Sequence, residues 1–307
     1  MTKIFIDGSA GTTGLRIADR LAQRKDISLI RLSEENRKDL SARSDAINSA
    51  DVVFLCLPDP AAMEAVSLTK NPQTKIIDTS TAHRTNPAWV YGMPELKGQL
   101  EKIQNSTRIA NPGCHASGFV ALVAPLVNEG MIGKDTLLSA FSLTGYSGGG
   151  KKMIAEYEDP SRSALLKAPR QYATTQQHKH LKEMVALCGL ENAPVFCPIV
   201  ADFYSGMEVT VPLFADQLKG NTEQLKDLYK TYYQGGLIHY TDEADPDGML
   251  SANAWADRDD MSVSVMGNEE RIILTARFDN LGKGASGAAI QNMNILLGFD
   301  QSTGLNV

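Results

Sequence analysis

The sequence lacks the cysteine patterns of zinc sites and of disulfide-rich secreted domains. Its 307 residues include four cysteines, and no two of them form a CxxC pair or show zinc-ligand spacing. The N-terminus, MTKIFIDG, begins directly with a strand pattern and lacks the layout of a signal peptide. We therefore expect a cytoplasmic protein with reduced thiols and no bound metal.

Long apolar runs and basic runs are missing as well. No stretch approaches the roughly 20 apolar residues that cross a bilayer. The net charge is −6, and no long run of Lys and Arg occurs. We therefore expect neither a membrane nor a nucleic acid as a main partner. The chain also has no internal repeat or low-complexity tract, and its 43% hydrophobic and 21% charged residues suit a globular protein with two domains.

Strand and helix patterns alternate over the first third of the chain. The strand candidates are nearly continuous in apolar residues, as buried parallel strands are. They cover residues 3–7, 27–32, 51–57 and 75–78, with helical patterns at 13–24 and 60–69. This alternation predicts an α/β, Rossmann-type domain with a parallel sheet and helices on its faces.

The pattern changes after residue 114. We expect a helix from about 115 to 129, then longer strands that form one mixed or antiparallel sheet in an α+β domain. The later elements expected are strands at 136–146, 194–200, 206–214 and 271–279, and a final helix at 284–298. We predict a first domain over residues 1–113, completed by 284–307, and a second domain over 114–283.

The stretch GSAGTTGL joins the first expected strand to the first expected helix. Gly8, Gly11 and Gly14 are spaced to let the backbone turn tightly and approach a pyrophosphate at the helix N-terminus. Thr12 and Thr13 add hydroxyl donors. The alternative is a glycine-rich turn without a ligand, but the strand–turn–helix context favours a dinucleotide site.

The end of the second expected strand bears on which dinucleotide binds. An NAD site usually has an acidic residue there, which holds the ribose 2′-hydroxyl. Here Ser33, Arg37 and Lys38 suit a 2′-phosphate, although Glu34 and Glu35 lie among them. We therefore expect NADP. The alternative is that Arg37 and Lys38 are simply solvated helix residues.

Cys114 lies in NPGCHASGF, at the expected start of a helix. A helix N-terminus favours the thiolate form of a cysteine. Burial as a small apolar residue is the alternative. A dinucleotide domain next to such a thiol suggests thiolate attack on an acyl group or aldehyde, with hydride transfer at the same carbon.

A base is needed to activate the thiol, and QQHKHLKEM offers His178 and His180 at another expected helix start. His115 follows Cys114 directly, and adjacent helical side chains point about 100° apart, so we expect it to serve the thiol poorly. No carboxylate or thiol cluster accompanies the histidine pair, which argues against a metal site.

Polar and cationic segments complete the set of candidate site residues. TGYSGGGKKM can wrap an anionic substrate through Ser147 and Gly148, with Lys151 supplying charge. Arg84 can pair with a phosphate or a carboxylate. Each of these has an alternative interpretation as an ordinary surface-loop residue.

Several motifs, in this order, resemble the short form of N-acetyl-gamma-glutamyl-phosphate reductase. They are GSAGTTGL, CLPD, IDTSTAHR, YGMPEL, ANPGCHASGF, GYSGGGKKMI, HKHLKEM, GMEVTVPL and DNLGKGASGAAIQNMNI, and they span nearly the whole chain. The resemblance implies NADPH-dependent reduction of an acyl phosphate, N-acetyl-glutamyl 5-phosphate, to its semialdehyde in arginine biosynthesis. It also implies a homodimer or homotetramer assembled through the second domain.

The resemblance assigns roles to individual residues. It implies Cys114 as the nucleophile and the His178–His180 pair as the source of the acid/base, of which we prefer His180. The cofactor loop maps onto Gly8–Gly14, and the segment that contains Asn280 and Gly284 maps onto the stretch that closes over the nicotinamide. One position departs from the family, because His115 stands where a tyrosine is frequent.

Three other functions remain possible at this point. A sister enzyme such as an aspartate-semialdehyde dehydrogenase shares the chemistry but acts on another acyl phosphate. A non-catalytic NADP sensor needs the glycine loop but not Cys114. A cysteine hydrolase needs the thiol but no dinucleotide.

Overall fold

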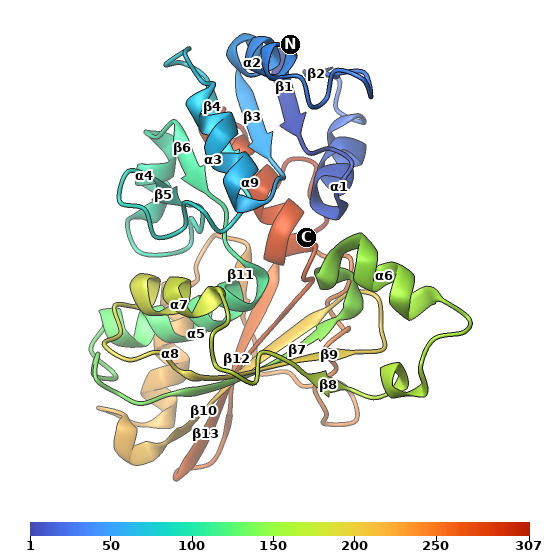
Figure 1. Cartoon of the computed structure of the whole chain (residues 1–307). Helices are drawn as coiled ribbons and strands as arrows, with labels where there is room; N and C mark the ends of the chain where they lie inside the picture. Colours follow the sequence, from blue (N-terminus) through green and yellow to red (C-terminus); the bar gives the residue numbers. More distant parts are fainter. The chain divides into compact units, whose positions relative to one another are not determined.

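The computed structural model describes all 307 residues and divides them into two compact units. Unit 1 comprises Met1–Pro94, Gly98–Pro112 and Ala285–Leu305, and unit 2 comprises Glu95–Lys97, Gly113–Gly284 and Asn306–Val307. In Figure 1, unit 1 holds the blue and cyan segments and helix α9. The short segment Glu95–Lys97 joins unit 2 because the buried Glu95 carboxylate lies 2.6 Å from Lys283 Nζ.

Unit 1 contains a sheet in which all paired strands are parallel, in the order β2-β1-β3-β4-β6-β5. This confirms the predicted Rossmann-type sheet. The strands are β1 (Thr2–Asp7), β2 (Ile27–Ile30), β3 (Val52–Leu55), β4 (Lys75–Asp78), β5 (Val90–Tyr91) and β6 (Arg108–Ala110). The short strands β5 and β6 were not expected from the sequence.

Alternate side chains of these strands enter two separate apolar clusters, because successive side chains of a strand point to opposite faces. Val52 and Phe54 of β3 belong to one cluster, and Val53 and Leu55 belong to the other. Helices with apolar faces cover both sides. They are α1 (Thr12–Leu21), α2 (Leu40–Ser49), α3 (Asp59–Ser67), α4 (Gln99–Gln104) and α9 (Gly287–Leu296).

The expected C-terminal helix at 284–298 is not one continuous α-helix. A π-helical turn occupies Gly282–Ser286, and α9 begins only at Gly287. The cause lies just upstream, where Asp279 Oδ1 accepts the N–H groups of Leu281 and Gly282. These bonds hold the chain in a side-chain-capped turn and delay the start of the regular helix.

Unit 2 contains a mixed sheet in the order β11-β12-β13-β10-β7-β9-β8, as predicted for an α+β domain. The neighbouring pairs β12–β13, β13–β10 and β10–β7 are antiparallel. The pairs β11–β12 and β7–β9 are parallel. The strands are β7 (Ser139–Gly145), β8 (Arg170–Gln171), β9 (Val195–Ala201), β10 (Met207–Phe214), β11 (Ile238–Tyr240), β12 (Met261–Gly267) and β13 (Arg271–Phe278).

The central helix of unit 2 is α5, which packs against β10, β13 and α7 (Figure 1). Its residues from His115 to Leu126 are all buried, as the apolar sequence requires. The helices are α5 (Cys114–Asn128), α6 (Gly150–Glu158), α7 (His180–Cys188) and α8 (Thr222–Tyr232), with 3-10 turns at Tyr146–Gly149, Ala164–Lys167 and Ala215–Gln217.

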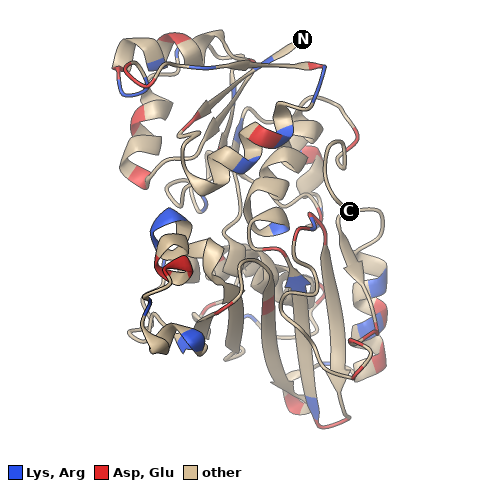
Figure 2. Cartoon of the chain, turned by 90° about the vertical axis from the view of Figure 1, so that its right-hand side faces the viewer, with Lys and Arg blue, Asp and Glu red and all other residues tan.

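Charged residues of both signs lie on several helices of both units (Figure 2), whereas α5 and α9 contain none. This distribution agrees with the absence of long basic runs in the sequence. None of the helices is both long and apolar enough to cross a membrane.

Gly118 sets how closely α5 approaches the sheet. A Cβ at this position would lie 2.5 Å from Val209 Cγ2 and 2.9 Å from a Phe278 ring carbon. We expect Gly118→Ala to lower the free energy of unfolding by about 1–2 kcal/mol, because overpacking outweighs the gain of about 1 kcal/mol in helix propensity. Urea unfolding measures this change.

A second substitution tests the cause. Val209→Ala removes the methyl group that the added Cβ would strike, so it should cost less stability in the Gly118→Ala background than in the wild type. Equal costs in both backgrounds would contradict the proposed contact.

Candidate active site

The glycine loop between β1 and α1 has no room for side chains at two positions. Gly8 adopts φ +89°, and a Cβ there would lie 2.3 Å from the carbonyl oxygen of Cys56. A Cβ at Gly14 would lie 2.5 Å from the Gly8 carbonyl oxygen. Gly11 precedes α1 and donates its N–H to the Gly8 carbonyl at 3.0 Å. The loop thus exposes backbone at the N-terminus of α1, as a pyrophosphate site requires.

A side chain in this turn also fits a phosphate ligand. Thr12 Oγ1 is buried and has no hydrogen-bond partner, although it lies in the first turn of α1. A buried hydroxyl without a partner is costly, and a phosphate oxygen at the helix N-terminus would accept a hydrogen bond from it. Thr13 follows in the same turn. These residues of unit 1 fit a dinucleotide phosphate.

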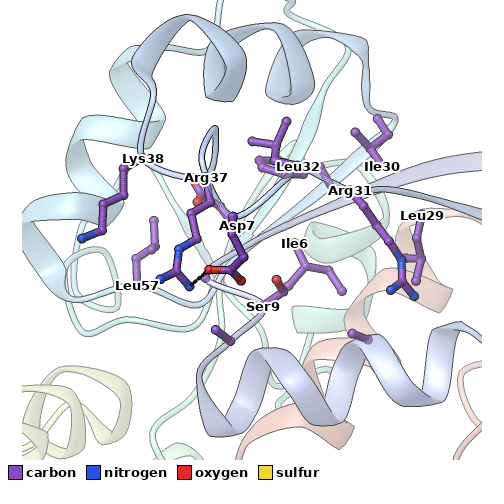
Figure 3. Close-up of a pocket in the computed structure, with 15 residues that line it drawn as sticks. Ile6, Asp7, Ser9, Leu29, Ile30, Arg31, Leu32, Arg37, Lys38 and Leu57 are labelled. Carbon is purple, nitrogen blue, oxygen red and sulfur yellow. Dashed lines mark ion pairs between the residues drawn. The ribbon is translucent and has the colours of Figure 1, made fainter.

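A cavity of about 450 Å³ lies beside this loop in unit 1 (Figure 3). The loop residue Gly8 lines it, together with Arg31, Arg37 and Lys38 from the segment after β2. Arg37 Nη1 lies 3.0 Å from a carboxylate oxygen of Glu34. Asp7 and Glu34 line it too, and the three cationic side chains suit a 2′-phosphate.

Ser33 lies in the turn just before Arg37. It does not line the cavity, and its carbonyl oxygen accepts the N–H groups of Asn36 and Arg37 at 3.0 Å each. Its backbone therefore shapes the turn that presents Arg37.

In unit 2, Cys114 is the first residue of α5, as predicted. The preceding residue, Gly113, donates its N–H at 2.8 Å to the buried carboxylate of Glu183. Gly284 lies against the cysteine, since a Cβ there would be 3.0 Å from Cys114 Cβ. The thiol therefore sits at the positive end of a 15-residue helix, with a glycine beside it.

Helix α7 explains the spacing of the histidine motif. His180 and Glu183 lie three residues apart, on one face of the helix, and both are buried. His178 precedes the helix, and its Nδ1 accepts the His180 N–H at 3.2 Å. His178 thus caps α7, while Glu183 holds the turn before Cys114.

The imidazole of His178 is neutral at physiological pH. Burial, followed by the nearby charge of Lys179, lowers its pKa to about 4. Because Nδ1 accepts a backbone N–H, the proton lies on Nε2. The rings of His178 and His180 are edge to face, with centroids 4.7 Å apart.

The loop before α7 has a strained backbone. Ala173 and Gln176 adopt φ angles of +50° and +58°, which side chains other than glycine rarely accept. The Gln176 side chain bonds both the N–H and the carbonyl of Phe196, at 2.8 and 2.7 Å. These two hydrogen bonds to β9 hold the loop that carries His178.

His115 lies beside these residues, in a network that the sequence did not reveal. Its Nδ1 is 2.6 Å from Ser142 Oγ, and its Nε2 is 2.6 Å from Tyr172 Oη. Its ring centroid is 5.4 Å from that of His178 and 5.6 Å from that of His180. Sequence reasoning missed Tyr172 and Ser142, because neither belongs to a motif with a chemical meaning.

Glu183 was also missed, although the sequence contained the evidence. It follows His180 by three residues in HKHLKE, and that spacing places both on one helix face. Gln176 gave no comparable indication, because its partner on β9 is 20 residues away.

Asn280, Ser147 and Gly148 lie together in unit 2. Asn280 Nδ2 donates to Ser147 Oγ at 3.0 Å, and its Oδ1 accepts the Gly206 N–H at 2.9 Å. A Cβ at Gly148 would lie 3.2 Å from Asn280 Nδ2. Lys151 lies exposed on α6, just beyond this group.

Arg84 lies within unit 1 and is buried. Its Nε donates to the Asn111 carbonyl and its Nη2 to the Thr79 carbonyl, both at 2.9 Å. These bonds join the loops after β4 and β6. The guanidinium is thus held by backbone carbonyls within unit 1.

Two other cysteines are unsuited to nucleophilic chemistry. Burial raises the pKa of Cys56 to about 12 and that of Cys188 well above its usual range. Both thiols are therefore protonated near neutral pH. No disulfide joins any of the four cysteines.

Family comparisons agree with this arrangement. Residues 3–105 match the family described as semialdehyde dehydrogenase, NAD binding domain. Residues 114–280 match semialdehyde dehydrogenase, dimerisation domain.

Curated relatives match over almost the full length. The chain is 44% identical to N-acetyl-gamma-glutamyl-phosphate reductase 2 of Nostoc sp., covering 99% of both chains. It is 42% identical to the enzyme of the same name from Pseudomonas putida, covering 98% of both. It is 44% identical to N-acetyl-gamma-glutamyl-phosphate reductase of Brucella ovis, covering 96% of this chain and 99% of the relative.

Solved structures share the fold. Aspartate semialdehyde dehydrogenase II of Vibrio cholerae, complexed with ASA, matches with a TM-score of 0.72 and 16% identity, covering 97% of this chain and 98% of the other. The aspartate semialdehyde dehydrogenase of Francisella tularensis matches with a TM-score of 0.73 and 14% identity, covering 97% and 100%. At these identities the likeness concerns the fold alone.

Arg37 provides a test of the cavity in unit 1. We expect Arg37→Ala to weaken NADPH binding about tenfold, because a bond to a charged phosphate contributes roughly 1.5 kcal/mol. NADH binding should change less than about twofold, since NADH has no 2′-phosphate. Titration of nicotinamide fluorescence gives both dissociation constants.

Arg271→Ala is a matched control, because Arg271 is another exposed arginine paired with a neighbouring glutamate, at 3.3 Å from Glu270. It should leave both dissociation constants unchanged. Equal weakening of NADPH and NADH by Arg37→Ala would exclude the 2′-phosphate contact.

Proposed function

The chain belongs to the N-acetyl-gamma-glutamyl-phosphate reductase family of semialdehyde dehydrogenases, and we propose the following reaction for it. N-acetyl-glutamyl 5-phosphate is reduced to N-acetyl-glutamate 5-semialdehyde, with NADPH as the hydride donor and release of phosphate. The reaction is a step of arginine biosynthesis. The observation that carries the proposal is the thiol of Cys114 at the start of α5, beside the α7 turn with His178 and His180.

In the first step, the Cys114 thiolate attacks the acyl carbon. A bond forms between Sγ and that carbon, and the bond from carbon to the phosphate oxygen breaks, which leaves a thioester. The first N–H groups of α5 have no partner within the helix, so they can stabilise the oxyanion that forms on the way.

The residues of unit 1 that hold the cofactor are those of the glycine loop and of the cavity beside it. Gly8, Gly11 and Gly14 let the backbone approach the pyrophosphate, and Thr12 donates to it. Arg37 binds the 2′-phosphate. When bound, NADPH supplies the hydride that reduces the thioester to a thiohemiacetal.

His180 moves the protons. It accepts the proton of Cys114 Sγ and passes it to the oxygen of the leaving phosphate. After reduction, the thiohemiacetal collapses to the aldehyde, and the expelled sulfur regains a proton through the same imidazole. His178 supports this residue, since it accepts the His180 N–H and so fixes the start of α7.

The substrate contacts that we propose lie around Asn280. Ser147 and Gly148 are placed there by the Asn280 side chain, and Lys151 supplies a positive charge from α6. Because Gly284 has no side chain, it leaves the space beside Cys114 open. Arg84 is proposed as a structural residue, because its guanidinium bonds two backbone carbonyls.

The alternative functions have less support. Likeness to aspartate semialdehyde dehydrogenases stands at 14–17% identity, whereas the N-acetyl-gamma-glutamyl-phosphate reductases stand at 42–44%. A sensor without catalysis leaves the buried His180 and the strained loop unexplained. A cysteine hydrolase leaves the glycine loop unexplained.

We further propose that the outer face of the unit 2 sheet forms a homodimer. Large apolar side chains are exposed on its strands and at their ends: Phe141, Val195, Phe214 and Ile273. An apolar sheet face of this kind marks an association surface. The match of residues 114–280 to the dimerisation domain of the family supports this assignment.

The reaction is tested most simply in reverse. Wild-type enzyme, NADP, N-acetyl-glutamate semialdehyde and inorganic phosphate should give NADPH absorbance, and omission of phosphate should abolish steady turnover. Cys114→Ser should lower the rate by at least about a thousandfold, because removal of the nucleophile removes the covalent route. Cys197→Ser is the matched control, and it should retain the wild-type rate.

Two outcomes would contradict the proposal. Near-native turnover by Cys114→Ser would exclude the thioester. Turnover with aspartate semialdehyde in place of the N-acetylated substrate would assign the sister function.

The histidine pair offers a second test. His180→Asn should lower kcat by about 10²–10⁴, the usual contribution of a general acid/base. His178→Asn should stay within about threefold of the wild type, because an asparagine oxygen can accept the N–H two residues along. Steady-state kinetics of both variants separate the two roles, and the opposite ranking would assign proton transfer to His178.

A further inference from the structure

His115 belongs to a buried chain of three polar groups in unit 2. Ser142 Oγ lies 2.6 Å from His115 Nδ1, and Tyr172 Oη lies 2.6 Å from His115 Nε2. His115 has these two bonds, and each hydroxyl has His115 as its one hydrogen-bond partner. Burial, followed by the charges of His178 and Lys179, lowers the pKa of His115 to about 3, so the imidazole is neutral.

A neutral imidazole has one N–H donor and one acceptor nitrogen, so the chain has two possible directions. In one, Ser142 donates to Nδ1, Nε2–H donates to Tyr172, and the Tyr172 proton is left available. In the other, Tyr172 donates to Nε2 and Nδ1–H donates to Ser142. The Ser142 hydroxyl proton then has no acceptor.

Burial decides between these directions. Ser142 is 0% exposed and has no second acceptor, so an unused proton there would cost about 1–3 kcal/mol. Tyr172 is only partly buried, so its proton can reach a ligand or water. The first direction is therefore favoured, and Tyr172 presents its hydroxyl as a donor.

The Tyr172 hydroxyl bonds His115, the residue after Cys114 in the first turn of α5. Its phenol also feels the charge of Cys114. Burial, followed by the charge of the Cys114 thiolate, raises the pKa of Tyr172, which keeps the phenol protonated. The phenol proton is not used by His115 in the favoured direction, so it is available to a group attached to the sulfur.

We propose that Tyr172 Oη donates a hydrogen bond to the oxygen of the acyl group on Cys114, beside the N–H groups of α5. His115 and Ser142 are positioning residues that orient this donor. The inference deepens the proposed function, since it assigns an oxyanion contact in the same reaction. It also gives a role to His115, which stands where the family frequently has a tyrosine.

Two reactions of Cys114 test this donor without the natural substrate or the cofactor. Acylation by p-nitrophenyl acetate passes through a tetrahedral intermediate whose former carbonyl oxygen is an oxyanion. Alkylation by iodoacetamide forms no oxyanion. We expect Tyr172→Phe to slow acylation about 10–100-fold and to leave the alkylation rate within about twofold. Ser142→Ala should slow acylation about three- to tenfold, because it removes the proton that orients His115.

The double variant Tyr172→Phe/Ser142→Ala should acylate as Tyr172→Phe does, because Ser142 acts through Tyr172. Tyr232→Phe is the matched control. Its hydroxyl bonds Asn128, at the opposite end of α5 from Cys114, and the variant should match the wild type.

Three results would overturn the inference. Acylation of Tyr172→Phe at the wild-type rate would show that the Tyr172 hydroxyl does not donate to the oxyanion. An equal fall in acylation and alkylation would place the hydroxyl at the thiolate or in the general structure. If the two losses in acylation rate multiplied in the double variant, Ser142 would act independently of Tyr172. Because these assays need neither NADP nor the semialdehyde, their outcome is independent of the reverse-reaction test of the proposed function.

Discussion

In unit 2, the Gly113 N–H donates to the buried carboxylate of Glu183, 70 residues further along the chain. The bond fixes the backbone directly before Cys114 to the first turn of α7. His180 lies one turn before Glu183 on the same helix face, so one contact positions both Cys114 and His180. A hydrogen bond to a charged group contributes about 1.5–3 kcal/mol.

The charges around the thiol follow from burial. His115 and His178 both have pKa values lowered by burial, to about 3 and about 4, so neither offers a positive charge to the thiolate near neutral pH. The thiolate is instead favoured by the N-terminus of α5. The two neutral rings act through hydrogen bonds instead: His178 accepts the His180 N–H, and His115 bonds Ser142 and Tyr172.

Close backbone contacts recur at the functional positions. At Gly8 and Gly14 in unit 1, and at Gly118 and Gly284 in unit 2, a Cβ would lie within 3.0 Å of another heavy atom. In each place the missing side chain lets another group approach: a backbone carbonyl at the first two, the sheet at Gly118, and Cys114 at Gly284. The strained loop at Gln176 serves a related purpose, because its bonds to Phe196 hold the backbone that carries His178.

The sequence by itself determined the parallel sheet of unit 1, the mixed sheet of unit 2, the glycine turn and the place of Cys114 at a helix start. These features depend on local periodicity and on spacing within short motifs, which a single sequence displays. The tertiary structure decided what depends on contacts between distant residues. It showed the bond from Gly113 to Glu183, the cap that His178 forms on α7, and the bonds of Arg84 to backbone carbonyls. It also brought Ser142 and Tyr172 to the two nitrogens of His115, because pairing of strands far apart in the chain, and not any local pattern, sets which side chains meet in a core.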